Sequence, residues 1–276
     1  MILSGVAATG PFRGALPFDE SGSSVFFGRQ VELEALYTQV LQDGVRVSAL
    51  TGPSGVGKTS LLRAGLLPVL ASEGYLGLYV GDYEDLDQEL IQAASRSRAE
   101  PPHAGEPMVD YVARLTHASR GGAVLMLDHL EAVVSDSAPA DAIDKIKRFL
   151  SGVLAAGGAR LRLLFSVDSD AYHLLGRLLP RSVLAATGST FELRTFDEDQ
   201  TAAVIEQTAL QTGTFIEAGL AGKMSTDLCR EGTLFPARPA DGGAHDDGPP
   251  PDIGAALRTK RRRGDAGPDL LRPRGR

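Results

Sequence analysis

The sequence predicts an α/β fold in which a five-stranded, mainly parallel sheet carries helices on both faces. Two observations lead to this prediction: short apolar runs alternate with segments of helical periodicity, and a glycine-rich loop follows the first run. Most of these runs are almost continuously apolar, which is typical of strands buried on both faces of a parallel sheet. The expected strands are Val45–Thr51, Leu76–Gly81, Ala123–Asp128, Leu161–Val167 and Thr190–Leu193.

Helical patterns fill the intervals between these strands and continue beyond the last of them. Apolar residues recur with helical spacing over Val31–Leu41, and an apolar helix is expected over Ser60–Leu70, after the glycine-rich loop. After the fifth strand, acidic residues open a helix near Phe196, where the helix dipole favours them, and a second helix covers Glu217–Arg230. These two helices predict the beginning of a small helical subdomain.

The glycine-rich loop has the complete phosphate-binding pattern GxxxxGK[ST]. Its glycines let the backbone turn tightly and point successive N–H groups at phosphates. Lys58 can reach the β- and γ-phosphates, the Thr59 hydroxyl can ligate Mg²⁺, and the following helix adds the positive end of its dipole. The pattern therefore predicts a P-loop NTPase fold that binds ATP or ADP with Mg²⁺. The expected nucleotide-binding residues of this segment are Gly52, Pro53, Ser54, Gly55, Val56, Gly57, Lys58, Thr59 and Ser60.

An acidic residue ends the third expected strand and has the form of a Walker B aspartate. Four apolar residues deliver Asp128 to the carboxyl edge of the sheet, where it would hold the Mg²⁺ shell through water, opposite Thr59. Glu131 is the candidate general base that polarises the attacking water. Many NTPases place that acid directly beside the aspartate, where this chain has His129, which is interpreted as a polar loop residue or a switch. The candidate catalytic residues are Lys58, Asp128 and Glu131, and the candidate metal ligands are Thr59 and Asp128.

The fourth expected strand should lie beside the loop strand, so that its end faces the γ-phosphate. Such an end normally presents a polar or basic side chain, but here it reads Asp168-Ser169-Asp170. Two carboxylates repel a triphosphate unless Mg²⁺ or a base intervenes. A capped helix start at Asp170 is the favoured interpretation of these acids, ahead of a second metal site.

The net charge and the composition argue against some kinds of binding partner. The net charge is −7, and because residues 237–276 hold nine Lys or Arg and six Asp, the rest of the chain carries −10. So acidic a body repels phosphates over most of its surface, which argues against nucleic acid as a partner. The sequence has no run of about 18 apolar residues that would predict a membrane span. Its single cysteine, Cys229, fits a reducing cytoplasm.

The character of the chain changes at Pro236. The residues that follow are mostly Gly, Pro, Ala and Arg, without an aromatic residue or a periodic pattern. Two interpretations stay open: a disordered tail, or a segment of a GC-rich gene read in a shifted frame. The expected organisation is an irregular leader over 1–24, a nucleotide-binding core over 25–195, a partial helical lid over 196–236 and this tail over 237–276.

Taken together, these residues resemble the bacterial novel STAND NTPases, the signal-transduction ATPases with numerous domains. The resemblance runs from about Pro11 to Pro236. It is carried by a leader and a Phe-Gly-Arg turn, a phosphate loop continued by a leucine-rich helix, an acidic motif and a helical lid. These motifs are Pro11–Gly14, Pro17-Phe18, Phe27–Arg29, Ser60–Pro68, Asp128–Glu131, Thr212–Phe215, Gly219–Ala221, Asp227-Leu228 and Gly232–Pro236.

The resemblance implies a nucleotide-controlled switch in bacterial signalling or defence. Such a switch rests closed with ADP and self-associates with ATP when a sensor domain detects its trigger. It also implies that Arg29 and Pro236 contact the nucleotide, the proline near the base. The chain departs from the family pattern at Asp168, where an arginine usually senses the γ-phosphate, and at Ala132, which replaces an acid. These departures predict nucleotide binding with weak or absent hydrolysis. A constitutive P-loop ATPase or motor and a truncated remnant that only binds nucleotide stay as alternatives.

Overall fold

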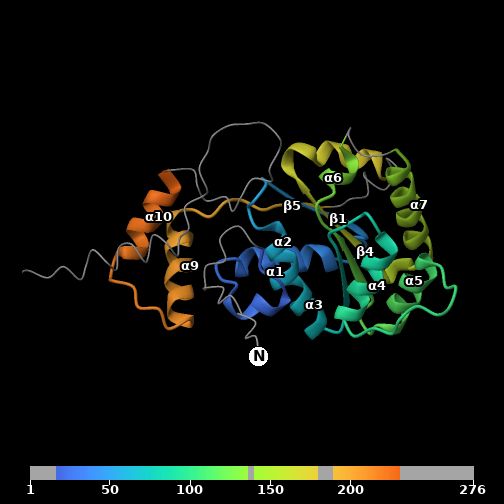
Figure 1. The fold of residues 1–276 in the computed structure, drawn as a ribbon, viewed down its shortest axis with the longest axis horizontal. Coiled ribbons are helices and arrows are strands. Elements are labelled where there is room, and N and C mark those ends of the chain that lie inside the picture. Colours follow the sequence, from blue (N-terminus) through green and yellow to red (C-terminus); the bar gives the residue numbers. More distant parts are fainter. Residues whose placement is uncertain (1–16, 136–139, 180–188, 231–276) are drawn as a thin grey trace, which may run out of the picture.

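Five strands form one parallel sheet in the order β2-β3-β4-β1-β5 (Figure 1). The computed structural model describes residues 17–135, 140–179 and 189–230. Each expected strand is present with its ends shifted by no more than two residues, and every pairing among them is parallel, which confirms the predicted fold class. The strands are β1 (Val47–Gly52), β2 (Leu76–Val80), β3 (Ala123–Leu127), β4 (Leu161–Asp168) and β5 (Ser189–Glu192).

The order of the strands positions the site. β4 lies beside β1, as the sequence predicts, and Gly52 is opposite Asp168 in their register. β2, which comes between β1 and β3 in the sequence, lies further out, at the edge beyond β3. Because the strands are parallel, their carboxyl ends share one edge, where open α/β sheets bind ligands. Gly52, Asp128 and Asp168 therefore come to the same edge of the sheet.

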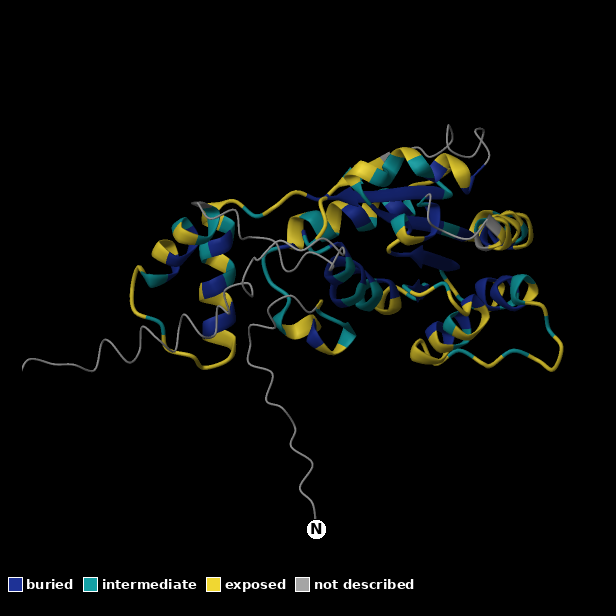
Figure 2. Ribbon diagram, turned by 45° about the horizontal axis from the view of Figure 1, so that its top comes forward, coloured by how far each residue is buried: buried dark blue, intermediate teal, exposed yellow. Residues whose placement is uncertain are grey.

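Helices cover both faces of the sheet, and the strands between them are buried (Figure 2). One face packs against α1 (Gln30–Leu41) and the helical segment after the phosphate loop, through residues such as Leu50 and Leu164. The opposite face uses the alternate strand residues, among them Ala49 and Leu163. The elements of this second face are α4 (Leu86–Arg96), α5 (Met108–Ala118), α6 (Glu131–Val134), α7 (Ala140–Ala156) and the 3-10 helix η4 (Ser169–Arg177). The short 3-10 helix η3 (Gly158–Arg160) lies between α7 and β4 in the chain.

The helical segment after the phosphate loop contains a widened turn, where the sequence predicts one helix over Ser60–Leu70. In this turn the Leu67 N–H donates to the Leu62 carbonyl, the spacing of a π-helix. Pro68 follows directly and has no N–H with which to continue regular α-helical bonding. The segment consists of α2 (Lys58–Ser60), the π-helix η2 (Leu61–Leu66) and α3 (Leu67–Ser72).

The end of the expected leader is ordered against this helical segment. The 3-10 helix η1 (Glu20–Val25) stands where the sequence predicts irregular structure. The Phe18 N–H donates to the Ser60 hydroxyl over 3.1 Å, and Arg63 pairs with Glu20 over 2.9 Å. Long-range contacts, which local patterns do not report, therefore order this part of the chain. Residues 1–16 of the expected leader and the expected tail over 237–276 lie outside the described residues.

Two helices after β5 form a small unit that lies beside the sheet domain (Figure 1). α9 (Glu198–Gln211) begins with a capping box, in which the side chains of Asp197 and Gln200 each accept the backbone N–H of the other. α10 (Leu220–Arg230) is shorter by three residues at its start than the helix the sequence predicts. No helix in the described part of the chain is long and apolar enough to cross a membrane. The buried residues that join the two helices are Ile205, Ala221 and Met224.

Candidate nucleotide-binding site

The phosphate loop joins the carboxyl end of β1 to the start of α2, and its backbone needs the glycines of the pattern. Gly55 and Gly57 have φ values of 78° and 100°, in the region that favours glycine. Gly52 has no room for a side chain, since a Cβ there would lie 2.6 Å from the Leu193 carbonyl oxygen. The pattern thus has the backbone conformation of a phosphate cradle. Of the remaining loop residues, Pro53 and Ser54 are exposed and Val56 is buried.

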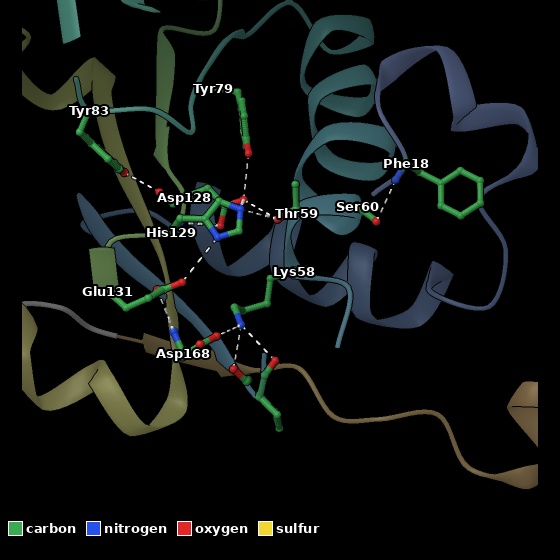
Figure 3. A network of polar contacts seen from close by, with 12 residues as sticks. Phe18, Lys58, Thr59, Ser60, Tyr79, Tyr83, Asp128, His129, Glu131 and Asp168 are labelled. Carbon is green, nitrogen blue, oxygen red and sulfur yellow. Dashed lines mark hydrogen bonds and ion pairs between the residues drawn. The ribbon is translucent and has the colours of Figure 1, made fainter. Parts of the chain in front are cut away.

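Lys58 is held at the sheet edge by three oxygen atoms (Figure 3). Its Nζ donates to the carbonyls of Gly52 and Pro53 over 2.8 and 3.1 Å and to Asp168 Oδ1 over 2.6 Å. The Lys58 side chain is only 7% exposed, whereas that of Asp168 is 29% exposed. The carboxylate therefore gives the lysine an anionic partner of the kind that a nucleotide phosphate would provide.

Asp168 is the N-cap residue of η4, two residues earlier than the capped helix start that the sequence predicts at Asp170. Its side chain makes no capping hydrogen bond and instead pairs with Lys58. Asp170 lies exposed in the first turn of η4. The capping interpretation was wrong because η4 already begins at Ser169, which puts Asp170 inside its first turn. The register of β4 against β1 brings Asp168 level with Gly52, next to the lysine.

Asp128 is fully buried after β3, and protein groups donate to both of its carboxylate oxygens. Oδ2 accepts from the Thr59 hydroxyl over 2.7 Å and from the Tyr79 hydroxyl over 2.9 Å, while Oδ1 accepts from the His129 N–H over 3.0 Å. Tyr83 donates to the Asp128 carbonyl over 2.6 Å. Burial, followed by the charge of Asp128, raises the pKa of both phenols, so they remain donors at neutral pH.

Thr59 and Asp128 fit a Mg²⁺ ion that binds together with a nucleotide. Within residues 17–135, 140–179 and 189–230, no group of three or more His, Cys, Asp and Glu side chains could hold a metal by itself. Mg²⁺ commonly takes few protein oxygens and fills its shell with substrate phosphates and water. A hydroxyl and a buried carboxylate 2.7 Å apart are a donor set of this kind. The ion, when bound there, would neutralise phosphate charge.

Glu131 opens α6 and lies between the ends of β3 and β4. Its Oε2 accepts the Asp168 N–H over 3.2 Å, and its Oε1 is 3.5 Å from His129 Nδ1. The hydrogen bond to Glu131 raises the pKa of His129. Burial raises the pKa of Glu131, but hydrogen bonds from His129 and from backbone N–H groups outweigh it and hold that pKa below its ordinary value. Glu131 is thus an ionised carboxylate, able to accept a proton from water at this edge.

Arg29 is buried against the phosphate loop and donates hydrogen bonds to it. It is 4% exposed, and its guanidinium donates to the carbonyls of Val56 and Arg194 over 3.2 and 2.8 Å and pairs with Glu32. It also lies 3.8 Å from the centre of the Phe196 ring, an arrangement that favours cation–π attraction. Arg29 therefore links the phosphate loop to the segment between β5 and α9, and its expected contact with the nucleotide stays a prediction.

Two further residues were expected to contact the nucleotide, and two tyrosines that the sequence did not indicate donate hydrogen bonds to Asp128. Ser60 is buried and accepts the Phe18 N–H, and Pro236 lies outside the described residues. Sequence reasoning missed Tyr79 and Tyr83, which belong to the edge strand β2 and the turn after it. No motif marks them; a tyrosine near the end of a buried strand, facing a Walker B acid, is the signal that could have found them.

Solved structures of low identity share the fold. The ORC2 protein of Aeropyrum pernix in its ADP form matches with a TM-score of 0.51 and 19% identity, over 67% of this chain and 53% of that chain. A Walker-type ATPase of Pyrococcus abyssi matches with a TM-score of 0.51 and 14% identity, over 80% and 72% of the two chains. The ORC1 protein of Aeropyrum pernix in complex with DNA matches with a TM-score of 0.50 and 19% identity, over 74% of this chain and 55% of that chain. The chain thus spans about half the length of the ORC2 and ORC1 proteins.

Family comparison is more specific than these structural likenesses. No curated protein sequence gives a significant match. The family model of novel STAND NTPase 1, however, matches residues 11–237, which is most of the chain. The matched range contains the phosphate loop, Asp128 and the helices α9 and α10, and it supports a nucleotide-binding P-loop module. The chain therefore belongs to the novel STAND NTPase 1 family.

Proposed function

We propose that the chain is the ATP- and ADP-binding switch module of a bacterial signalling or defence protein, with weak or absent intrinsic ATP hydrolysis. The observation that carries the proposal is the 2.6 Å contact between Lys58 Nζ and Asp168 Oδ1. An arginine near the γ-phosphate stabilises the charge of the transition state, whereas a carboxylate at this edge opposes it. Such a module changes state with the bound nucleotide and turns it over slowly.

The binding part of this proposal is supported by the loop glycines, Lys58 and the Thr59–Asp128 pair. We expect ATP and ADP to bind with Mg²⁺ in the micromolar range, about −8 kcal/mol. Lys58→Ala removes the charge that reaches the β- and γ-phosphates and should abolish binding in calorimetry. Equal affinity of wild type and variant would contradict the assignment of the loop.

The hydrolysis part rests on which groups surround the γ-phosphate position. We propose Glu131 as the base, supported by its lowered pKa and its contact with the Asp168 N–H, so that the missing contribution is a cation at the end of β4. We expect a turnover of about 0.01 per second or less, well below the usual range of phosphoryl-transfer enzymes. Asp168→Arg should raise it, whereas Asp170→Arg, at an exposed position two residues away, should not. Brisk phosphate release by the wild type would favour the alternative, a constitutive ATPase.

The switch role is supported by family membership and by the position of Arg29 between the phosphate loop and the lid. We propose that this link transmits the nucleotide state to α9 and α10, and that the partner is a second copy or a sensor or effector domain in the cytoplasm, with neither membrane nor nucleic acid. Light scattering should report a larger species with a non-hydrolysable ATP analogue than with ADP. The same size with both nucleotides would argue against a switch.

A further inference from the structure

His129 occupies an unusual place in the nucleotide site. It follows Asp128 directly and has a φ of 55°, a left-handed conformation that residues other than glycine seldom adopt. Its backbone N–H donates to Asp128 Oδ1 over 3.0 Å, which ties the turn to the Walker B acid. Figure 3 shows the resulting orientation: the imidazole lies between the Thr59–Asp128 pair and Glu131. Strained conformations of this kind persist where the surrounding structure enforces them, and they cluster at functional sites.

One ring nitrogen of His129 faces the two expected Mg²⁺ residues. Nε2 lies 3.3 Å from Thr59 Oγ1 and 3.6 Å from Asp128 Oδ2, and these two oxygens are 2.7 Å apart. Neighbouring ligands of an octahedral cation with bonds of about 2.1 Å are about 3.0 Å apart. The three atoms thus have the spacing of one face of a coordination shell, and phosphate oxygens and water can supply the rest.

The other ring nitrogen of His129 faces a carboxylate. Nδ1 lies 3.5 Å from Glu131 Oε1, so a neutral ring that carries its proton on Nδ1 donates to Glu131 and directs the lone pair of Nε2 at Thr59 and Asp128. Histidines that bind metals almost always present their second nitrogen to a carboxylate, a carbonyl or water in this way, which fixes the tautomer and the ring orientation. The Glu131 contact is therefore the arrangement that a metal-binding His129 requires.

We propose that His129 Nε2 is a direct ligand of the divalent cation that accompanies the nucleotide, so that the site prefers Mn²⁺ or Co²⁺ to Mg²⁺. This inference rests on the proposed nucleotide binding. Mg²⁺ takes oxygen ligands and gives up its water reluctantly, whereas imidazole nitrogen suits the transition metals. If Nε2 takes the place of one water in the coordination shell of the cation, that single ligand selects against Mg²⁺, and no site built from protein ligands alone is needed.

The test uses the full chain with ADP and either Mg²⁺ or Mn²⁺, at about pH 8, so that protons compete less with the cation for the ring nitrogen. Calorimetry should give an ADP affinity about tenfold higher with Mn²⁺ than with Mg²⁺ in the wild type. Pulsed electron paramagnetic resonance of the Mn²⁺–ADP complex should show modulation from a directly bound nitrogen. His129→Asn should remove both effects, because asparagine tolerates the left-handed backbone but its side chain is too short to reach the cation.

A matched control separates ligation from a general effect of losing a histidine. His173→Gln changes an exposed histidine of η4 and should leave the metal preference and the nitrogen signal intact. His129→Gln, which keeps more side-chain length, should lose the nitrogen signal as His129→Asn does. ADP binding without a nitrogen signal in the wild type would overturn this inference alone. If the wild type bound ADP with neither metal, the proposed nucleotide binding would fall as well.

Discussion

The Lys58–Asp168 pair makes a sharp prediction about nucleotide discrimination. Asp168→Asn keeps the shape of the side chain and removes the negative charge that lies 2.6 Å from the lysine ammonium group. In the wild type, a nucleotide must either displace this carboxylate or bind beside it. We therefore expect Asp168→Asn to strengthen ATP binding, and to strengthen ADP binding less, because ATP brings one more phosphate to the lysine.

The size of the effect follows from the geometry. A phosphate oxygen at about 2.8 Å on the far side of Lys58 Nζ would lie about 5 Å from the Asp168 carboxylate. Two unit charges at that separation interact by about 3 kcal/mol at an effective dielectric constant of about 20. Because the Asp168 side chain is 29% exposed, solvent screening reduces this repulsion, and we take about half of it. The ratio of ATP to ADP affinity should then rise about tenfold.

The assay is calorimetric titration of wild type and variant with Mg²⁺–ADP and with a non-hydrolysable Mg²⁺–ATP analogue. Two variants serve as controls: Asp170→Asn removes a charge of the same sign from an exposed position two residues away, and Asp168→Glu retains the charge. Neither should change the ratio of the two affinities by as much as Asp168→Asn. The effect should also weaken with added salt, since part of it is screened.

An unchanged ratio of ATP to ADP affinity in Asp168→Asn would refute the electrostatic argument. It would mean that Asp168 leaves the lysine and the phosphates when nucleotide binds, so that its charge no longer acts on them. A ratio that rises equally in Asp170→Asn would also refute it, because the effect would then be one of net charge rather than of this contact.

Three further predictions concern stability. Tyr79→Phe removes a donor from the buried Asp128 carboxylate and should cost about 1–3 kcal/mol of unfolding free energy in urea titration; no loss would mean that water replaces the phenol. Gly52→Ala places a Cβ 2.6 Å from the backbone oxygen of Leu193 and should cost about 1–3 kcal/mol and weaken ADP binding, whereas an unaltered melting temperature would contradict the close approach. Hydrogen bonds from Arg114 lower the pKa of Glu106 to about 2, so its contribution to stability is present above the ordinary value of 4.5 and is lost as the pH falls from there through about 2. The unfolding free energies of wild type and Glu106→Gln should converge as the pH falls over that range. If the two free energies ran parallel against pH, the lowered pKa of Glu106 would be contradicted.

Much of the architecture could be predicted from local patterns. A strand covered on both faces must be apolar almost throughout, so β1 to β4 are visible as apolar runs, and the loop after β1 is visible because a phosphate cradle needs glycine and lysine at fixed spacing. The acidic residues after Phe196 likewise predicted the start of α9, where the structure shows a capping box at Asp197 and Gln200. The 3-10 helix η1 was not predicted, because its order comes from contacts with Ser60 and Arg63 far along the chain.

The sequence by itself determined the fold class, the phosphate loop and the acids Asp128 and Glu131, because each of these can be recognised from a pattern of residues that are close together in the chain. Only the tertiary structure decided that Lys58 pairs with Asp168, 110 positions away, and that Tyr79 reaches Asp128 from the edge strand. The physical reason is that local periodicity reports whether a segment is helical, extended or buried. Which side chains meet at the sheet edge depends on strand order and register, and these are set by packing between segments far apart in the chain.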